Sequence, residues 1–230
     1  MPRHIGIVAC SAEGASLCYR TICTEGPALL GQDHAHPEVT MHTPSLAEYT
    51  ECLGSGDWQG VADLMLDSAD KLERIGADFL ICPDNTIHNA FDRVEPNSPL
   101  PWLHIVDVVA EAAVRRGFRS LGLTGTQWLV DGGVYPDRLA LRDLACIRPS
   151  PADCAEINRI IMEELTYGVF RPEAIAFHQA AIDRLKGAGC DAVILGCTEI
   201  PLIIDETNSS LPTLDSTRLL ARAALQHAID

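Results

Sequence analysis

Two stretches of the chain share one plan, and this repetition constrains the fold more than any other feature of the sequence. Residues 76–88 and 189–201 each begin with Gly-x-Asp, continue as a short apolar run and end in a polar turn. A short apolar run between turn residues is typical of a buried strand in a parallel sheet. When the two glycines are aligned, Asp84 falls on Cys197. The sequence therefore predicts a carboxylate and a thiol at equivalent positions of two similar structures.

The repetition extends to two other pairs of segments, which occur in the same order in each half of the chain. Residues 4–9 match residues 120–126, and residues 100–106 match residues 211–217. Matched strand and turn segments in one order indicate an internal duplication. We therefore expect an α/β protein of two lobes with parallel sheets, related by a pseudo-two-fold axis.

The matched segments also predict how the chain divides between the lobes. We expect the first lobe to comprise residues 1–105 and 211–230, and the second lobe to comprise residues 106–210. A further strand is expected at residues 39–43. Apolar spacing and helix start and stop signals predict helices at residues 15–25, 57–75, 107–116, 153–166 and 172–186.

Composition argues against several classes of protein. The formal net charge of -15 argues against a nucleic-acid partner, which calls for a basic face. No apolar run reaches the roughly 18 residues that a membrane span needs, and the first residues lead directly into a strand. The 9 cysteines, an odd number without a signal peptide, are expected to be reduced thiols. We therefore expect a cytoplasmic protein with no membrane or nucleic-acid partner.

The sequence indicates neither a cofactor nor a metal. Lys71 and Lys186 are the only lysines, and both lie in helical stretches beside charged residues, so the Schiff-base lysine of a pyridoxal-phosphate enzyme is not expected. His34, His36 and His42 lack an accompanying cysteine pair or His-Glu motif. We interpret the first two as part of a solvated loop.

Cys197 and Asp84 are the candidate reactive groups. Cys197 follows a glycine at a strand end, where a helix start favours the thiolate, although a buried and inert cysteine is the ordinary alternative. Asp84 also has an ordinary alternative, since an Asp before a helix commonly caps the free amide groups. If the lobes face each other, a carbon held between these groups loses a proton to one and receives a proton from the other.

Neighbouring turn residues complete the candidate cleft. Cys10 and Ser11 stand at the equivalent of Gly125 and Thr126 in the repeat, and we expect these positions to line the cleft. Cys82 lies two residues before Asp84, but its partner in the repeat is an apolar core position, so we interpret this thiol as part of the core.

Three motifs resemble the aspartate/glutamate racemase family, which includes hydantoin racemases, maleate isomerases and arylmalonate decarboxylases. They are residues 195–202 with their Gly-Cys-Thr-Glu run, the turn at residues 85–88, and residues 214–217 before the last helix. The resemblance spans nearly the whole chain. It implies two Rossmann-like lobes of the flavodoxin-like kind, a site in the cleft between them, cofactor-independent chemistry and a homodimer.

The resemblance also implies roles for individual residues. Cys197 matches one of the two catalytic thiols of the family's racemases, whereas Asp84 stands where the other thiol is usual, so the chain resembles an atypical member. The residues implied to bind the substrate or support it are polar: Asn85, Thr86, Thr198, His88 and Glu199.

Our leading hypothesis is a cofactor-independent amino-acid racemase or epimerase that transfers protons at the carbon next to a carboxylate. One alternative is a decarboxylase or isomerase of a small carboxylic acid with Cys197 as the single proton donor. A second alternative is a non-catalytic protein that binds a small carboxylate. The motifs contain no basic group for a substrate side chain, which favours a neutral or apolar side chain unless Arg20 or Arg138 supplies a cation.

Overall fold

The computed structural model describes residues 2–230, and Met1, at which the expected first lobe begins, lies outside the described residues. The chain forms two compact units. Unit 1 runs to Ile105 and resumes at Thr217, and unit 2 runs from Val106 to Ser216. We expected the chain to return to the first lobe at residue 211. This boundary is too early, because strand β8 (Thr213–Asp215) pairs with a strand of unit 2.

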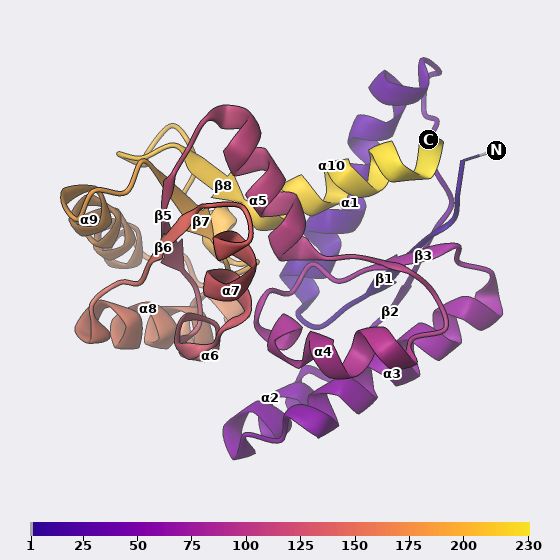
Figure 1. Ribbon diagram of the computed structural model, residues 1–230, viewed down its shortest axis with the longest axis horizontal. Coiled ribbons are helices and arrows are strands. Elements are labelled where there is room, and N and C mark those ends of the chain that lie inside the picture. The colour runs from indigo at the N-terminus through magenta and orange to yellow at the C-terminus, as the bar shows by residue number, and fades with distance from the viewer. Residues whose placement is uncertain (1) are drawn as a thin grey trace. The chain divides into compact units, whose positions relative to one another are not determined.

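Unit 1 holds a sheet of four parallel strands in the order β2-β1-β3-β4. The strands are β1 (Ile5–Val8), β2 (Val39–His42), β3 (Phe79–Ile81) and β4 (Trp102–Leu103). The helices are α1 (Ala12–Leu30), α2 (Leu46–Ser55), α3 (Trp58–Ile75), η1 (Thr86–Ala90), α4 (Phe91–Val94), η2 (Glu95–Asn97) and α10 (Ser216–Ile229). Figure 1 shows α1 and α10 on one side of this sheet and α2 and α3 on the other.

Unit 2 repeats this arrangement with the strand order β6-β5-β7-β8. The strands are β5 (Ser120–Thr124), β6 (Ala145–Ile147), β7 (Ala192–Leu195) and β8. The helices are α5 (Ile105–Arg116), α6 (Gln127–Asp131), α7 (Val134–Ala140), α8 (Pro151–Glu163), η3 (Leu165–Tyr167), α9 (Pro172–Gly187) and η4 (Ile200–Leu202). The predicted α/β class with two parallel sheets is confirmed.

Strand pairing follows the sequence repeat. In each sheet one residue of the second repeated segment, Ile81 or Ile194, lies opposite one residue of each neighbouring strand. The paired residues are Ile7, Ile81 and Leu103 in unit 1, and Leu123, Ile194 and Leu214 in unit 2. Equal strand order and equal register in the two units support the predicted duplication, because a shift of one residue would turn every side chain to the other face.

The shared Gly-x-Asp entry has the same structural role in both units. Gly76 is the C-cap of α3 and Gly189 follows the C-cap of α9, with φ of 98° and 93°, a conformation that costs a residue with a side chain. Asp78 then accepts a hydrogen bond from the backbone N–H of His4 at 2.7 Å. Asp191 accepts hydrogen bonds from the backbone N–H groups of Ser120 at 3.1 Å and of Arg119 at 2.7 Å. Each aspartate therefore fixes the start of the neighbouring strand.

Some elements differ from the expected ranges. Helix α1 continues past the expected end at residue 25 to Leu30, although Pro27 lies inside it, and ends at the left-handed C-cap Gly31. Strand β6 and helices α6 and α7 were not expected. Strand β6 is a short edge strand with partly exposed residues, and such a strand leaves no long apolar run in the sequence.

Candidate functional site

The first candidate turn, residues 82–88, follows strand β3 in unit 1. The Asp84 carboxylate accepts a hydrogen bond from the backbone N–H of Ile87 at 3.2 Å, so the carboxylate caps the start of η1. Its own backbone carbonyl lies 2.6 Å from Nδ1 of His88. Asp84 is half-buried, whereas Asn85 and Thr86 are buried. The capping interpretation of Asp84 is therefore correct in part, and the half-buried carboxylate remains open to a second role.

His88 contributes to the shape of this turn. Its ring lies parallel to that of Phe91, with centroids 5.6 Å apart, and meets the ring of His104 edge-on at 4.6 Å. Together with the bond to the Asp84 carbonyl, this packing holds the turn in one conformation. The supporting role that the resemblance implied for His88 stays a prediction.

The second candidate turn, residues 196–199, follows strand β7 in unit 2. The Cys197 thiol donates a hydrogen bond to Oε2 of Glu199 at 2.9 Å, and the Thr198 hydroxyl donates to the same oxygen at 2.7 Å. The Glu199 side chain is buried, with the residue 2% exposed. A buried carboxylate beside a thiol is a local proton acceptor, which a cysteine needs because the thiolate is its reactive form.

Close backbone packing fixes the position of this turn. A side chain on Gly196 would place its Cβ 2.6 Å from the carbonyl oxygen of Thr124, and a Cβ on Gly125 would lie 3.2 Å from the carbonyl oxygen of Gly196. The turns that follow β5 and β7 therefore pack directly on each other. Thr126, in the first of these turns, caps α6 by accepting a hydrogen bond from the backbone of Leu129 at 3.3 Å.

Ser11 has the same structural role in unit 1. Its hydroxyl accepts a hydrogen bond from the backbone N–H of Gly14 at 3.4 Å and caps α1. Because β1 and β3 are paired neighbours, the turn with Ser11 and the turn with Asp84 lie at the same edge of the first sheet. In unit 1 this edge thus gathers Ser11, Asp84, Asn85 and Thr86. In unit 2 the corresponding edge gathers Thr126, Cys197, Thr198 and Glu199.

The core interpretation of Cys82 is confirmed. Its side chain is fully buried, and burial raises the pKa of the thiol well above its ordinary value. The nearby Asp84 carboxylate acts in the same direction. A thiol with a raised pKa stays protonated, so Cys82 is a poor nucleophile.

Tyr49 is a buried residue near the first candidate turn. It lies in the first turns of α2, is fully buried, and its hydroxyl has no hydrogen-bond partner among residues 2–230. Burial raises the pKa of the phenol, and Cys82, Cys10 and Asp84 are among the groups that raise it further.

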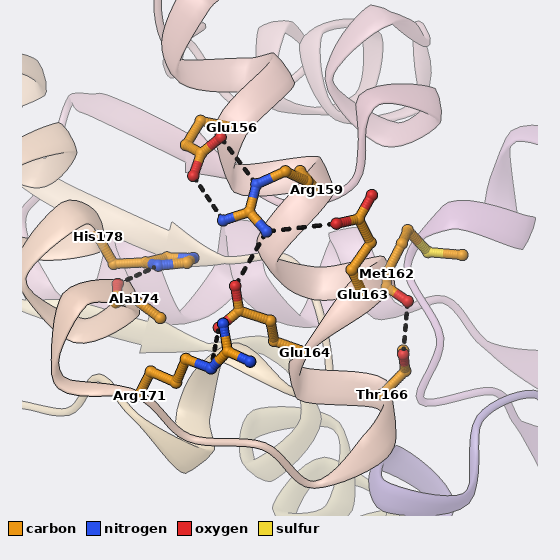
Figure 2. Close-up of polar contacts among 9 residues, drawn as sticks. All are labelled: Glu156, Arg159, Met162, Glu163, Glu164, Thr166, Arg171, Ala174 and His178. Carbon is orange, nitrogen blue, oxygen red and sulfur yellow. Dashed lines mark hydrogen bonds and ion pairs between the residues drawn. The ribbon is translucent and has the colours of Figure 1, made fainter.

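Several charged groups of unit 2 form ion pairs with one another. Arg138 pairs with Asp107 at 2.7 Å. Figure 2 shows a larger cluster in which Arg159 binds Glu156 at 2.7 Å and Glu164 at 2.9 Å. Since these arginines already have carboxylate partners, they do not supply the cation that an acidic substrate side chain requires.

Two further properties of residues 2–230 bear on the kind of site. No group of three or more His, Cys, Asp and Glu side chains in this part of the chain is arranged to hold a metal ion. No helix in the same range combines the length and the apolar character that crossing a membrane requires.

A pair of α/β units in which equivalent strand ends carry a carboxylate and a thiol is an arrangement suited to acid/base chemistry. The family model for Asp/Glu/hydantoin racemases matches residues 7–224. The chain belongs to this family. Its relatives are racemases, which are isomerases, and the expected enzyme class is thereby confirmed.

Individual relatives agree with this assignment. A putative Asp/Glu racemase from Yersinia pestis superposes with a TM-score of 0.89 at 31% sequence identity, over 99% of this chain and 100% of that chain. An aspartate racemase homologue from Pyrococcus horikoshii OT3 gives a TM-score of 0.84 at 28% identity, over 100% of both chains. The broad specificity amino-acid racemase RacX of Bacillus subtilis (strain 168) is 25% identical over 70% of this chain and 69% of its own length.

Proposed function

We propose that the protein is a cofactor-independent amino-acid racemase or epimerase, with Cys197 and Asp84 acting on opposite faces of the substrate α-carbon. The observation that carries the proposal is the bond from the Cys197 thiol to the buried Glu199 carboxylate at 2.9 Å. This bond gives the thiol a proton acceptor at the end of a parallel strand, where α/β folds bind ligands. A broad specificity amino-acid racemase among the relatives supports amino acids as substrates.

The proposed reaction moves protons in three steps. Glu199 takes the proton of the Cys197 thiol, and the thiolate then removes the α-proton from one enantiomer. Asp84, in its protonated form, delivers a proton to the opposite face of the resulting carbanion. In the reverse direction the Asp84 carboxylate is the base and the thiol is the acid. Ser11, Asn85, Thr86, Thr126 and Thr198 would hold the carboxylate and amino groups of the substrate.

One observation favours a second candidate function. The Asp84 carboxylate caps Ile87, and a capping carboxylate is a weaker base for a carbon acid. In that case Cys197 alone would protonate an enediolate after loss of carbon dioxide from a malonate-type acid. Under either function we expect a cytoplasmic homodimer, and gel filtration at about one chain mass would contradict the dimer.

Proton exchange at carbon tests the proposal. The wild type, Cys197→Ser and Asp84→Asn are incubated with L- and D-amino acids in deuterium oxide, and NMR follows loss of the α-proton signal. We expect Cys197→Ser to lower exchange by at least about 100-fold, the low end of the effect of a positioned acid/base group. The Asp84→Asn variant should still exchange the α-proton of one enantiomer but should no longer interconvert the two enantiomers.

A matched variant controls for loss of a thiol. Cys146→Ser changes a partly buried cysteine of β6 and should leave exchange unchanged. If the wild type exchanges no amino acid but releases carbon dioxide from a malonate-type acid, the racemase proposal is wrong and the single-base alternative holds.

A further inference from the structure

Side-chain hydroxyls hold the end of strand β7 from both sides. The Thr124 hydroxyl, at the end of β5, donates a hydrogen bond to the backbone carbonyl oxygen of Ile194 at 2.7 Å. The Ser216 hydroxyl donates to the backbone carbonyl oxygen of Leu195 at 2.8 Å. Both hydroxyl residues are buried, so water does not replace these bonds. The last two carbonyl groups of β7, directly before the turn that carries Cys197, are therefore fixed.

Ser216 stands where the chain leaves the second sheet. Strand β8 ends at Asp215, which lies opposite Leu195, and α10 begins at Ser216. The hydroxyl of Tyr135, a fully buried residue of α7, hydrogen-bonds with that of Ser216. Because Ser216 gives its only hydroxyl proton to Leu195, Tyr135 is the donor in this bond. The three groups form a buried row of hydrogen bonds that runs from α7 to the end of β7.

The duplication indicates that the fold does not require these hydroxyls. In unit 1 the strand register places Val8 at the position of Thr124 and Ile105 at the position of Ser216. Both of these residues are buried and apolar. A buried hydroxyl costs free energy of desolvation that an apolar side chain does not. At these two positions the hydroxyls stand in the unit that carries the thiol, which points to a role in the chemistry of the thiol.

The thiol needs a fixed position to act as an acid and a base. Its hydrogen bond to Oε2 of Glu199 is 2.9 Å long, and proton transfer requires hydrogen-bonding distance. Gly196 is the one residue between Leu195 and Cys197, and glycine has more backbone freedom than any other residue. The direction of the Cys197 side chain therefore depends on how firmly the peptide group before Gly196 is held.

We propose that Thr124 and Ser216, the second of them supported by Tyr135, are positioning residues that hold the Cys197 thiol in line with Glu199. Each hydroxyl acts through a backbone carbonyl group of β7 and not on the substrate itself. The inference rests on the proposed racemase function, to which it adds the residues that keep one of the two acid/base groups in place.

Thr124→Val and Ser216→Ala remove one hydroxyl each, and the first change introduces the residue that unit 1 has at this position. We expect each variant to lower kcat for amino-acid racemisation by about 10- to 100-fold, because a misplacement of about 1 Å costs up to about 100-fold. KM should change less than about twofold, because the groups that bind the substrate are unaltered. An unchanged kcat in either variant, or a rise in KM alone, would overturn the inference and leave the racemase proposal intact.

Ser68→Ala is the matched control for the loss of a buried hydroxyl. Ser68 is 0% exposed in unit 1, and its hydroxyl donates to the backbone carbonyl oxygen of Leu64 at 3.0 Å. We expect Ser68→Ala to lower Tm about as much as Ser216→Ala does while kcat stays at the wild-type value. An equal loss of kcat in the two variants would show that general destabilisation is the cause, and would refute the positioning role.

Tyr135→Phe tests the support of Ser216, because it removes the donor and keeps the ring in the core. If Tyr135 acts through Ser216, the double variant Tyr135→Phe/Ser216→Ala should have the same kcat as Ser216→Ala alone. Losses that add in the double variant would contradict the row of hydrogen bonds from Tyr135 to Leu195.

Crystal structures separate the failure of this inference from the failure of the racemase proposal. If the wild type racemises no amino acid, the distance from Sγ of Cys197 to Oε2 of Glu199 still reports the position of the thiol. A separation beyond hydrogen-bonding distance in Ser216→Ala and Thr124→Val supports the inference. A bond that stays at 2.9 Å in both variants refutes it.

Discussion

Glu199 links the chemistry of the second turn to its structure. Its Oε2 accepts hydrogen bonds from both residues that precede it, Cys197 and Thr198. A carboxylate buried without a cation is costly unless hydrogen bonds satisfy it. The same two bonds therefore hold the turn, and under the proposed function the carboxylate is also the proton acceptor of the thiol.

Glu199→Gln should separate these two contributions. Glutamine keeps the size of the side chain and an acceptor oxygen but accepts no proton from the thiol. We expect α-proton exchange to fall by about 100-fold, within the range for a lost proton acceptor, while Tm changes little. Exchange is measured by NMR in deuterium oxide. Glu206→Gln, which alters an exposed glutamate of the same unit, should have no effect, and an equal loss in both variants would contradict the role of Glu199.

At the residue scale the sequence predicted which positions carry polar groups but not which hydrogen bonds these groups form. The positions of Cys197 and Asp84 follow from the aligned repeat alone. The bond between Cys197 and Glu199 depends on side-chain torsions that no spacing specifies. That the Tyr49 hydroxyl is buried without a hydrogen-bond partner among residues 2–230 is likewise a property of packing, which the local sequence does not specify.

At the scale of elements, the turn after β7 depends on a backbone approach that only glycine permits. The carbonyl oxygen of Thr124 occupies the space that a Cβ on Gly196 would need. The atom is part of a central strand, so it cannot move aside as a flexible side chain would. The turn and strand β5 therefore form one rigid unit beneath Cys197.

Gly196→Ala should consequently displace the turn. We expect a loss of about 1–3 kcal/mol in the free energy of unfolding, as for overpacking elsewhere, together with reduced α-proton exchange. Urea denaturation gives the first value and NMR gives the second. Gly187→Ala is the matched control: nothing lies within 4 Å of the place that its Cβ would take, so its stability should be unchanged or slightly higher. Similar losses in both variants would refute the argument from close packing.

Long apolar runs and amphipathic helices were predictable because each carries its own periodicity. The central strands β1, β3, β5 and β7 are fully buried or nearly so, which requires apolar residues at successive positions. Edge strand β6 and the short helices α6 and α7 bury fewer residues and left no comparable pattern. The expected end of α1 at residue 25 was wrong, because the helix continues through Pro27 to Leu30 and ends at the left-handed C-cap Gly31.

At the scale of the whole molecule, duplication supplies two versions of one supporting contact. Asp78 binds the backbone before β1, and Asp191 binds the backbone before β5 and at its first residue. The two aspartates are matched in sequence, and the strands that they support are matched as well. Their roles can therefore be compared directly, each serving as the control for the other.

Asp78→Ala and Asp191→Ala should each weaken the strand start in their own unit. We expect about 1 kcal/mol of lost stability per variant, the usual net value of a hydrogen bond. Hydrogen exchange followed by mass spectrometry should show faster exchange at β1 in the first variant and at β5 in the second. Asp70→Ala, an exposed change on α3, should show neither effect. Faster exchange at both strands in one variant would contradict a local role.

The late return of the chain to unit 1 has a consequence for biosynthesis. Unit 2 is continuous from Val106 to Ser216, whereas unit 1 requires helix α10 from the end of the chain. Domains generally fold as units while the ribosome is still adding residues. The thiol-bearing unit is thus complete on the nascent chain while the carboxylate-bearing unit still lacks α10, one of the two helices that cover one face of its sheet.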